Sequence, residues 1–247
     1  MAKKIYSKTR KILADDVNML REMRHSVFLR WLQEASIAHT EELGAGRDKT
    51  LDRGALWIIA RVKVEITRMP EYDETVTMTT WPGETMHVLF PRYYEITDAD
   101  GNAIVKASAV WLLMDAATRK MTFPEKFDVR VPGTVTGREI PLPTGTAPCS
   151  ETTVHGTHKV AFQDVDINGH MNNSKYIDIV EDCLGFGFMT SSRLTGFEIN
   201  YLNEIRAGKR VALDGNVSDG RISFSGHVGK TPCFNFSATY IPREQSH

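Results

Sequence analysis

The sequence predicts an α+β protein built from two similar halves, each with one long helix followed by several antiparallel strands. Two observations lead to this prediction. The order of one helix and then several strands occurs twice, from residue 26 and again from residue 174. In addition, VKVEITRMPEYDETV (62–76) can be laid over FEINYLNEIRAGKRV (197–211) without a gap, and each reads as strand, turn and strand. In each half a sheet is needed to bury the apolar helix.

The first half opens with a helical pattern in SVFLRWLQEASIAHTEELG. Phe28, Trp31, Leu32 and Ala35 are three or four residues apart, and Gly44 is a stop signal, so we expect a helix of about four turns. Strand-like runs follow in LWIIARVKVEI, TVTMTTW and HVLFPRYYEI, and AIVKASAVWLLM comes after a turn at DADGN. The first half is therefore predicted to be a helix with four strands.

The second half repeats this order. Its helix face is given by Tyr176, Ile177, Val180, Cys183 and Leu184. Its strands are LTGFEINYL, RVALDGNV, ISFSGHV and CFNFSATYI, with a turn at SDGR, and VHGTHKV upstream reads as a strand or a turn. Between the halves, VPGTVTGREIPLPTGTAPCSET is rich in Pro, Gly, Ser and Thr, as in a linker. We predict a first domain at 1–135, a linker at 136–150 and a second domain at 151–247.

Composition excludes several classes of function. The net charge of -1, from 30 basic and 31 acidic residues, provides no general attraction for nucleic acid or an anionic membrane. The opening MAKKIYSKTRKILADDV has no apolar core of a signal peptide, and no apolar run is long enough for a membrane span, so a cytoplasmic protein is expected. Cys149, Cys183 and Cys233 show no CxxC spacing and predict neither disulfides nor a zinc site.

A cluster of short polar residues stands before the second helix, in AFQDVDINGHMNNSKYIDIVEDCL. Asp166, Asn168 and His170 recur at every second position, so an extended segment would project all three from one side. Asn172, Asn173 or Ser174 can then cap the helix, whose free N–H groups can polarise a carbonyl and hold an oxyanion.

Capping alone can also explain such a cluster, because Asp and Asn are common at turns and helix starts. The two halves differ, however. When residues are counted back from Trp31 and from Tyr176, and the strands are overlaid, the first-half counterparts of Asp166, Asn168, His170 and Glu204 are Arg21, Met23, His25 and Met69. The polar set is thus concentrated in the second half, which favours a functional role there.

Five blocks of the sequence carry a resemblance to a known family. DVDINGHMNNSKYIDIVED and FEINYLNEIRAGKRV, with LQEASIAHTEELG, WIIARVKVEI and WLLMDAATRKM, resemble the acyl-acyl carrier protein (ACP) thioesterases of plant plastids and bacteria over nearly the whole chain. The resemblance implies two tandem hot-dog domains, each a curved antiparallel sheet wrapped around a long helix. It also implies that the family's Asp-x-Asn-x-His motif falls on Asp166, Asn168 and His170, and its catalytic Glu on Glu204.

One position departs from the family pattern. Many plant members carry a Cys directly after the catalytic Glu, and this chain has Ile205 there. If this protein is active, that Cys is not required. The hypothesis is that Glu204 with His170 activates a water, that Asn168 orients the imidazole or the thioester, and that Asp166 either holds the network or attacks the carbonyl itself. A general base and a covalent carboxylate both remain open.

The resemblance implies that the first half sets substrate specificity. Burial of a fatty acyl chain contributes roughly 0.8 kcal/mol for each methylene, so an apolar tunnel would select chain length. We expect residues such as Trp57, Met78 and Trp111 to line it, although for any one of them an ordinary core position is the favoured interpretation. We also expect Asn172 and Asn173 to contact the substrate.

ACPs are acidic, so the docking site should be basic. The candidates are Lys175, Arg206, Lys209 and Arg210, although a solvated turn would carry such charges in any case. The sequence also allows a homodimer.

Other readings compete with acyl-ACP hydrolysis. An acyl-CoA thioesterase would keep the chemistry and change the carrier. Hot-dog enoyl-CoA hydratases carry a signature resembling Asp-x-Asn-x-x-His, one residue longer than the spacing from Asp166 to His170. A non-catalytic acyl-binding protein would not need buried polar groups that cost free energy. His155 and His158 lack a third ligand nearby, so neither a metal nor another cofactor is expected.

Overall fold

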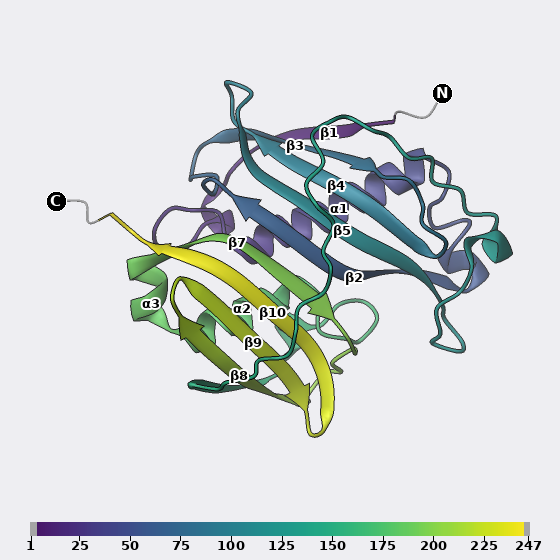
Figure 1. The fold of residues 1–247 in the computed structure, drawn as a ribbon. Helices are drawn as coiled ribbons and strands as arrows, with labels where there is room; N and C mark the ends of the chain where they lie inside the picture. Colours follow the sequence, from purple (N-terminus) through teal and green to yellow (C-terminus); the bar gives the residue numbers. More distant parts are fainter. Residues whose placement is uncertain (1–3, 245–247) are drawn as a thin grey trace.

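The structure is a computed structural model that describes residues 4–244. Within that range, ten strands form one antiparallel sheet, and two longer helices, α1 (His25–Glu42) and α2 (Lys175–Leu184), lie against one of its faces (Figure 1). The strands of the first half are β1 (Tyr6–Lys11), β2 (Ala55–Ile66), β3 (Thr75–Pro82), β4 (Leu89–Thr97) and β5 (Ala103–Asp115). Those of the second half are β6 (Val154–Lys159), β7 (Ser192–Tyr201), β8 (Arg210–Ser218), β9 (Arg221–Val228) and β10 (Thr231–Pro242).

Short helices complete the elements. They are the 3-10 turns η1 (Ala14–Asp16), η2 (Leu51–Arg53), η3 (Pro124–Phe127) and η4 (Phe162–Asp164), and the short helix α3 (Phe186–Ser191).

The sheet repeats one strand order. Its full order is β1-β3-β4-β5-β2-β7-β10-β9-β8-β6. From the outer edge of the sheet to its centre, each half has its first strand, then its third, fourth and fifth strands, and then its second strand. The halves join where β2 pairs antiparallel with β7, from Arg61 opposite Asn200 to Glu65 opposite Gly196. The predicted repeat is therefore confirmed, and each predicted strand run lies on a strand. The short edge strand β1 was not predicted.

Helix α1 is longer than predicted. Its 18 residues make about five turns, and the predicted apolar stripe of Phe28, Trp31, Leu32 and Ala35 is buried, each residue at most 2% exposed. Gly44, with φ of +71°, follows the helix end and adopts the left-handed conformation that glycine accepts readily. The sequence pattern thus located the helix and its end correctly.

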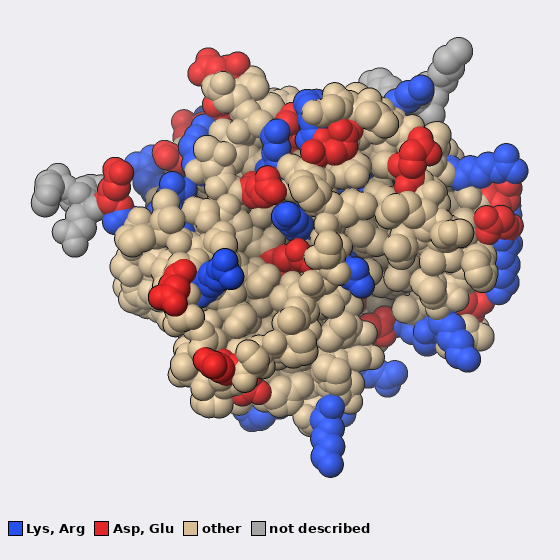
Figure 2. Space-filling view, viewed as in Figure 1, with Lys and Arg blue, Asp and Glu red and all other residues tan. Residues whose placement is uncertain are grey.

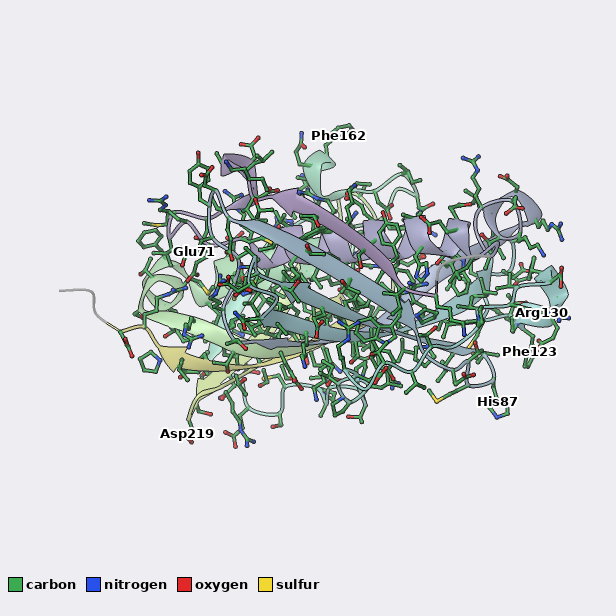
Figure 3. The ribbon with its side chains drawn as sticks, turned by 90° about the horizontal axis from the view of Figure 1, so that it is seen from above. Glu71, His87, Phe123, Arg130, Phe162 and Asp219 are labelled. Carbon is green, nitrogen blue, oxygen red and sulfur yellow. The ribbon has the colours of Figure 1, made fainter. Side chains whose placement is uncertain are left out.

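An irregular segment covers the opposite face of the sheet. Residues 129–153, which include the predicted linker 136–150, contain neither helix nor strand and run across the strands on the side away from α1 (Figures 1 and 3). Ser108 Oγ donates to the carbonyl of Pro141 (2.9 Å), and the Gly145 N–H donates to Glu198 Oε1 (2.8 Å). These bonds hold the segment on strands of both halves.

The main hydrophobic core is continuous across the two halves. Leu32 and Val62 from the first half and Ile177 and Ile199 from the second are all fully buried in one cluster. At roughly 25 cal/mol per Å² of apolar surface removed from water, this shared burial stabilises both halves together. In residues 4–244, no helix combines the length and the apolarity needed to cross a bilayer.

Candidate active site

The polar cluster forms a closed loop at the entrance to α2. At its start, Asp164 Oδ2 accepts the Ala161 N–H (2.8 Å) and lies 2.7 Å from His158 Nε2. Burial alone would raise the pKa of the Asp164 carboxyl, but the Ala161 N–H and the His158 ring outweigh burial and hold that pKa below its usual range. Val165 and Met171 form a β-bridge across the loop. The loop is therefore anchored at its base.

Within the loop, residues 166–170 make a tight turn rather than the extended segment that was predicted. The Asp166 N–H donates to the His170 carbonyl (2.8 Å), and the Gly169 N–H donates to the Asp166 carbonyl (3.1 Å). Asp166 Oδ1 accepts the N–H groups of Asn168 (2.8 Å) and His170 (3.2 Å). Side-chain bonding to nearby N–H groups competes with extended structure, and here it folds the segment back on itself.

The loop brings His170 to Glu204. The Met171 N–H donates to the Ile205 carbonyl (2.7 Å), and His170 forms a β-bridge with Arg206, which aligns the two segments. His170 Nε2 then lies 3.4 Å from Glu204 Oε2, with 17% of the His170 side chain exposed. The other glutamate oxygen, Oε1, accepts a hydrogen bond from Arg119. An imidazole and a carboxylate therefore meet at a partly open surface.

Asn172 and Asn173 shape the start of α2. Asn172 Oδ1 accepts bonds from the Ser174 N–H (3.0 Å) and from Ser174 Oγ (2.9 Å), whereas Ser174 makes no side-chain cap. Tyr201 donates its hydroxyl to the Asn173 carbonyl (3.0 Å). Burial raises the pKa of Tyr201, so its phenol stays protonated as a donor. The side chain of Asn172 is thus used to shape the helix entrance.

A cavity of about 340 Å³ leads from this loop into the first half. Its wall contains the aromatic residues Trp57, Phe90 and Trp111, together with Ile167 and Asn168 of the loop. The ring of Trp57 meets that of Phe90 edge-on, with 4.8 Å between centroids, and its indole N–H donates to a backbone carbonyl. The volume lies at the lower end of the range for ligand pockets, and the aromatic wall suits an apolar ligand.

Not all predicted substrate residues border this cavity. Trp57 and Trp111 do, whereas Met78 is fully buried in the main core and is not part of the wall. Among the described residues, Asn172 and Asn173 are also outside the wall. Met78 lies on β3, which pairs with β1 and β4, and the strand pattern alone could not show which buried residues border empty space.

The predicted docking residues differ in their contacts. Lys175 Nζ bonds Asp178 (3.0 Å). Arg206, Lys209 and Arg210 are exposed, and within residues 4–244 none of the three pairs with a carboxylate. A second group of basic residues gathers at the edge where α1 ends and η3 lies (Figure 2), but Lys49 and Lys126 of that group are paired with acidic residues. The turn after Glu204 therefore keeps its positive charge available.

The first half contains a structural duplicate of the loop, at residues 16–24. Asn18 Oδ1 accepts the N–H groups of Leu20 (2.9 Å) and Glu22 (3.2 Å), as Asp166 Oδ1 does with Asn168 and His170. The first-half counterparts of Asp166, Asn168 and His170 are therefore Asn18, Leu20 and Glu22.

The predicted overlay of Arg21, Met23 and His25 was three residues out. The two loops are related by a shift of 148 positions (166 − 18), which pairs Tyr176 with Phe28. The count paired Tyr176 with Trp31 instead, three residues further along α1.

The strand overlay is confirmed at Glu204. Glu22 forms a β-bridge with Glu71, and His170 forms one with Arg206. Met69 and Glu204 each lie two residues before that bridge, so they occupy the same place in the two halves. Met69 is buried (6% exposed), and no carboxylate stands there in the first half.

The two histidines of VHGTHKV each face a carboxylate. His158 Nε2 bonds Asp164, and His155 Nδ1 lies 3.0 Å from Asp214 Oδ1. In the described part of the chain, no group of three His, Cys, Asp or Glu side chains is arranged to hold a metal ion. Cys149, Cys183 and Cys233 are free thiols.

Comparison with known protein families decides where this arrangement belongs. The family model for the acyl-ACP thioesterase N-terminal domain matches residues 3–126, and that for the acyl-ACP thioesterase C-terminal domain matches residues 148–227. The chain belongs to the acyl-ACP thioesterase family. This confirms the resemblance seen in the sequence.

Curated relatives come from plant members of the family. An acyl-[acyl-carrier-protein] hydrolase of Cuphea viscosissima is 25% identical over 195 residues, which are 70% of this chain and 45% of that protein. A dodecanoyl-[acyl-carrier-protein] hydrolase of Cinnamomum camphora is 24% identical over 214 residues, 81% of this chain and 56% of that protein. Both are chloroplastic. The chain thus spans about half the length of the curated relatives it matches.

Solved structures show the same fold. An acyl-ACP thioesterase of Bacteroides thetaiotaomicron superposes with a TM-score of 0.83 at 20% identity, covering 96% of this chain and 98% of that one. The 12:0-ACP thioesterase of Umbellularia californica gives 0.82 at 19% identity, covering 98% and 99%. At this level of identity, the likeness shows that the fold is that of the acyl-ACP thioesterases.

Two residues at the site were not predicted. Phe90 lines the cavity, and Arg119 bonds Glu204. Phe90 lies in the strand run HVLFPRYYEI, where its apolar character indicated only a core position. Arg119 lies in the block WLLMDAATRKM, 85 positions before Glu204, and nothing local to that block indicates a contact with the second half.

Proposed function

We propose that this protein hydrolyses fatty acyl-ACP thioesters to free fatty acid and ACP, as a cytoplasmic enzyme of fatty acid biosynthesis. The observation that carries the proposal is the pairing of His170 with Glu204 (3.4 Å). His170 lies on the loop whose Asn168 lines the aromatic-walled cavity. The family membership of the chain supports the choice of substrate. A thioester carbonyl that reaches Asn168 would lie close to the catalytic pair, with its acyl chain directed into the first half.

In the proposed reaction, Glu204 and His170 together take a proton from a water, and that water attacks the thioester carbonyl. A thiolate is a good leaving group, so strong acid assistance is not needed. Asn168 would orient the thioester. Asp166 acts as a positioning residue, because one of its oxygens already accepts two backbone N–H groups of the loop.

A covalent route through Asp166 makes a different prediction. If Asp166 attacks the thioester carbonyl, the thiolate leaves and an acyl–aspartyl anhydride forms. Single-turnover hydrolysis in heavy-oxygen water then leaves label in the Asp166 carboxylate when water opens the anhydride at the aspartyl carbonyl. We expect mass spectrometry of the peptide that contains Asp166 to find none. Label at Asp166 would replace the water-activation mechanism with the covalent one.

The proposed architecture is two tandem hot-dog domains, at 1–135 and 151–247, joined by the linker 136–150, with a sheet wrapped around a helix in each. The equal strand order of the halves supports this division. The first domain would set specificity by burying the acyl chain, at roughly 0.8 kcal/mol for each methylene. One chain would then hold one complete site, and a homodimer is not required for it.

The proposed carrier-docking surface is the turn that follows Glu204, with Arg206, Lys209 and Arg210, together with Lys175. Its duplicate in the first half has the opposite charge. Glu74 occupies the place of Lys209, because the carbonyl of Glu74 accepts the Ile12 N–H (2.8 Å) as that of Lys209 accepts the Val160 N–H (2.9 Å). Glu71, labelled in Figure 3, stands in the place of Arg206. Glu74 is itself paired with Arg68 (2.7 Å), so what distinguishes the two turns is the unpaired positive charge of the second half. An acidic carrier is therefore attracted to the second half.

The test is thiol release from matched panels of acyl-ACPs and acyl-CoAs that span short to long chains. We expect turnover of acyl-ACP that exceeds turnover of acyl-CoA at every chain length. Faster thiol release from acyl-CoA would support the same hydrolysis with CoA as the carrier in place of ACP. No release from any thioester would contradict the proposed function.

A further inference from the structure

Arg119 belongs to the first half, but its guanidinium bonds the glutamate of the second. It lies on the turn after β5, and Nη2 donates to Glu204 Oε1. The halves therefore meet at the catalytic pair as well as along β2 and β7. Apart from this contact, the ion-pair partners at the site come from the second half itself: Glu204 for His170, and Asp164 for His158.

The turn that carries Arg119 is held rigidly. Asp115 Oδ1 accepts the N–H groups of Ala117 (3.1 Å) and Thr118 (2.9 Å), and the Arg119 N–H donates to the Asp115 carbonyl (2.9 Å). The bond from Lys126, followed by those from Thr118, holds the pKa of the Asp115 carboxyl well below its usual range, so it stays an acceptor. Arg119 has φ of +57°, a left-handed conformation that a residue with a side chain keeps only where its surroundings impose it.

The backbone around Glu204 is equally fixed. The N–H groups of Leu202 and Asn203 both donate to the Cys233 carbonyl (2.9 and 3.1 Å), and Asn203 Nδ2 donates to the Pro232 carbonyl (2.8 Å). On the other side, Ile205 is 1% exposed. What remains free is the rotation of the Glu204 side chain, and the bond from Arg119 to Oε1 restricts it.

This contact is too exposed to contribute much to stability. Both side chains are 38% exposed, and exposed ion pairs contribute little to folding. Its effect is on orientation: with Oε1 held by Arg119, Oε2 is the oxygen that faces His170 Nε2. Reacting groups that are misplaced by about 1 Å can lose about 100-fold in rate, so a contact of small energy can still control turnover.

We propose that Arg119 is a positioning residue, supplied by the first half, that fixes the Glu204 carboxylate with Oε2 toward His170. This inference rests on the proposed hydrolase function. It makes the active site a composite of both halves. The block WLLMDAATRKM then has a role in the site besides its place in a strand and turn.

The test compares Arg119→Met, Arg119→Lys and the control Lys120→Met with the wild type, on an acyl-pantetheine substrate that lacks the carrier. We expect kcat to fall about 10- to 100-fold in Arg119→Met, with KM within about twofold, and a partial recovery in Arg119→Lys. Lys120 is exposed on the same turn, so Lys120→Met should match the wild type. In a Glu204→Ala background, Arg119→Met should cause no further loss, because the group it positions is absent.

Three outcomes would overturn the proposal. One is an unchanged kcat in Arg119→Met. Another is a loss seen only with acyl-ACP, expressed in KM and removed by salt, which would make Arg119 a docking residue. The third is that Arg119→Met lowers kcat by the same factor in the Glu204→Ala background as in the wild type, which would show that Arg119 acts elsewhere.

A second measurement keeps the positioning claim separate from the proposed activity. Crystal structures of the wild type and Arg119→Met should show Glu204 Oε2 beyond hydrogen-bonding reach of His170 Nε2 in the variant alone. If the wild type releases no thiol, the proposed function fails and this comparison still decides the role of Arg119. An unchanged separation in the variant would overturn it.

Discussion

The loop at 164–172 and its duplicate at 16–24 share a backbone and differ in chemistry. Asp166 and Asn18 close their loops with matching bonds, at 2.8 and 3.2 Å in one and 2.9 and 3.2 Å in the other. An amide oxygen therefore performs the same structural task as a carboxylate. What the second half adds is Asn168 and His170 on the loop and Glu204 on the neighbouring turn. The comparison separates the residues that shape the loop from those that can react.

Cavity size alone favours the duplicate loop. A hollow of about 640 Å³ lies beside the duplicate, nearly twice the volume of the aromatic-walled cavity. Four of the charged groups in its wall are paired with one another: Glu22 makes two bonds to Arg243 (2.7 and 2.6 Å), and His25 lies 2.5 Å from Glu181. At the places that correspond to His170 and Glu204 the duplicate has Glu22 and Met69, so the smaller cavity is the better candidate.

The largest expected effect comes from replacing the second-half histidine. His170→Ala should lower kcat/KM by about 10²- to 10⁴-fold, the usual contribution of general acid–base catalysis. The matched control is Glu22→Gln at the duplicate position, which should leave kcat/KM within about twofold. Steady-state thiol release measures both. Equal losses in the two variants would show that the halves do not differ in chemistry.

Substitutions at Asp166 separate its role in the structure of the loop from a role in the reaction. Because Asn18 closes the duplicate loop, Asp166→Asn should keep the melting temperature and most of the activity. Asp166→Ala and Asn18→Ala should each lose about 1–3 kcal/mol of unfolding free energy, as expected when N–H groups lose their acceptor. Denaturant unfolding and thiol release measure the two properties. A stable but inactive Asp166→Asn would mean that the carboxylate itself is required.

The opposite charges of the two turns predict a smaller effect on carrier binding. Lys209→Glu gives the second half the residue that the first half has at Glu74, and it should raise KM for acyl-ACP several-fold at low salt. At high salt, screening should reduce the difference in KM between Lys209→Glu and the wild type. This reduction should be equal for all chain lengths. Acyl-pantetheine is the control, since it has no carrier to dock. An increase in KM on that substrate would assign Lys209 to the catalytic site instead.

The smallest expected effect concerns the partly buried His25–Glu181 pair beside the duplicate. Burial opposes protonation of His25, but the charge and hydrogen bond of Glu181 outweigh it and raise the pKa of His25 above its ordinary value of 6.5. The folded state therefore binds the proton more tightly, so the pair stabilises the protein below pH 6.5. That contribution is lost as pH rises through the folded-state pKa.

As pH rises from below 6.5 through the folded-state pKa of His25, the free energy of unfolding should decline by an amount on the order of 1 kcal/mol. In Glu181→Gln the decline should be absent. A wild-type stability that rises over the same range would show that the sign of the shift is wrong.

The sequence predicted elements that depend on local spacing and missed features that depend on tertiary contact. The period of Phe28 and Trp31 located α1, and strand alternation located β2. The turn at 166–170 was missed because side-chain bonds by Asp166 override the extended pattern. Arg119 was missed because its contact joins two turns that are distant in the sequence. The loop overlay was wrong because the count paired Tyr176 with Trp31 in place of Phe28.

The most direct test of the account is to give the second half the residue found at the corresponding place in the first, by Glu204→Met. Met69 fills that place in the duplicate, so the variant should fold and bind acyl-ACP as the wild type does. Single-turnover thiol release should fall by at least about 100-fold. Release at the wild-type rate, with acyl-ACP binding unchanged, would contradict the claim that the His170–Glu204 pair performs the reaction.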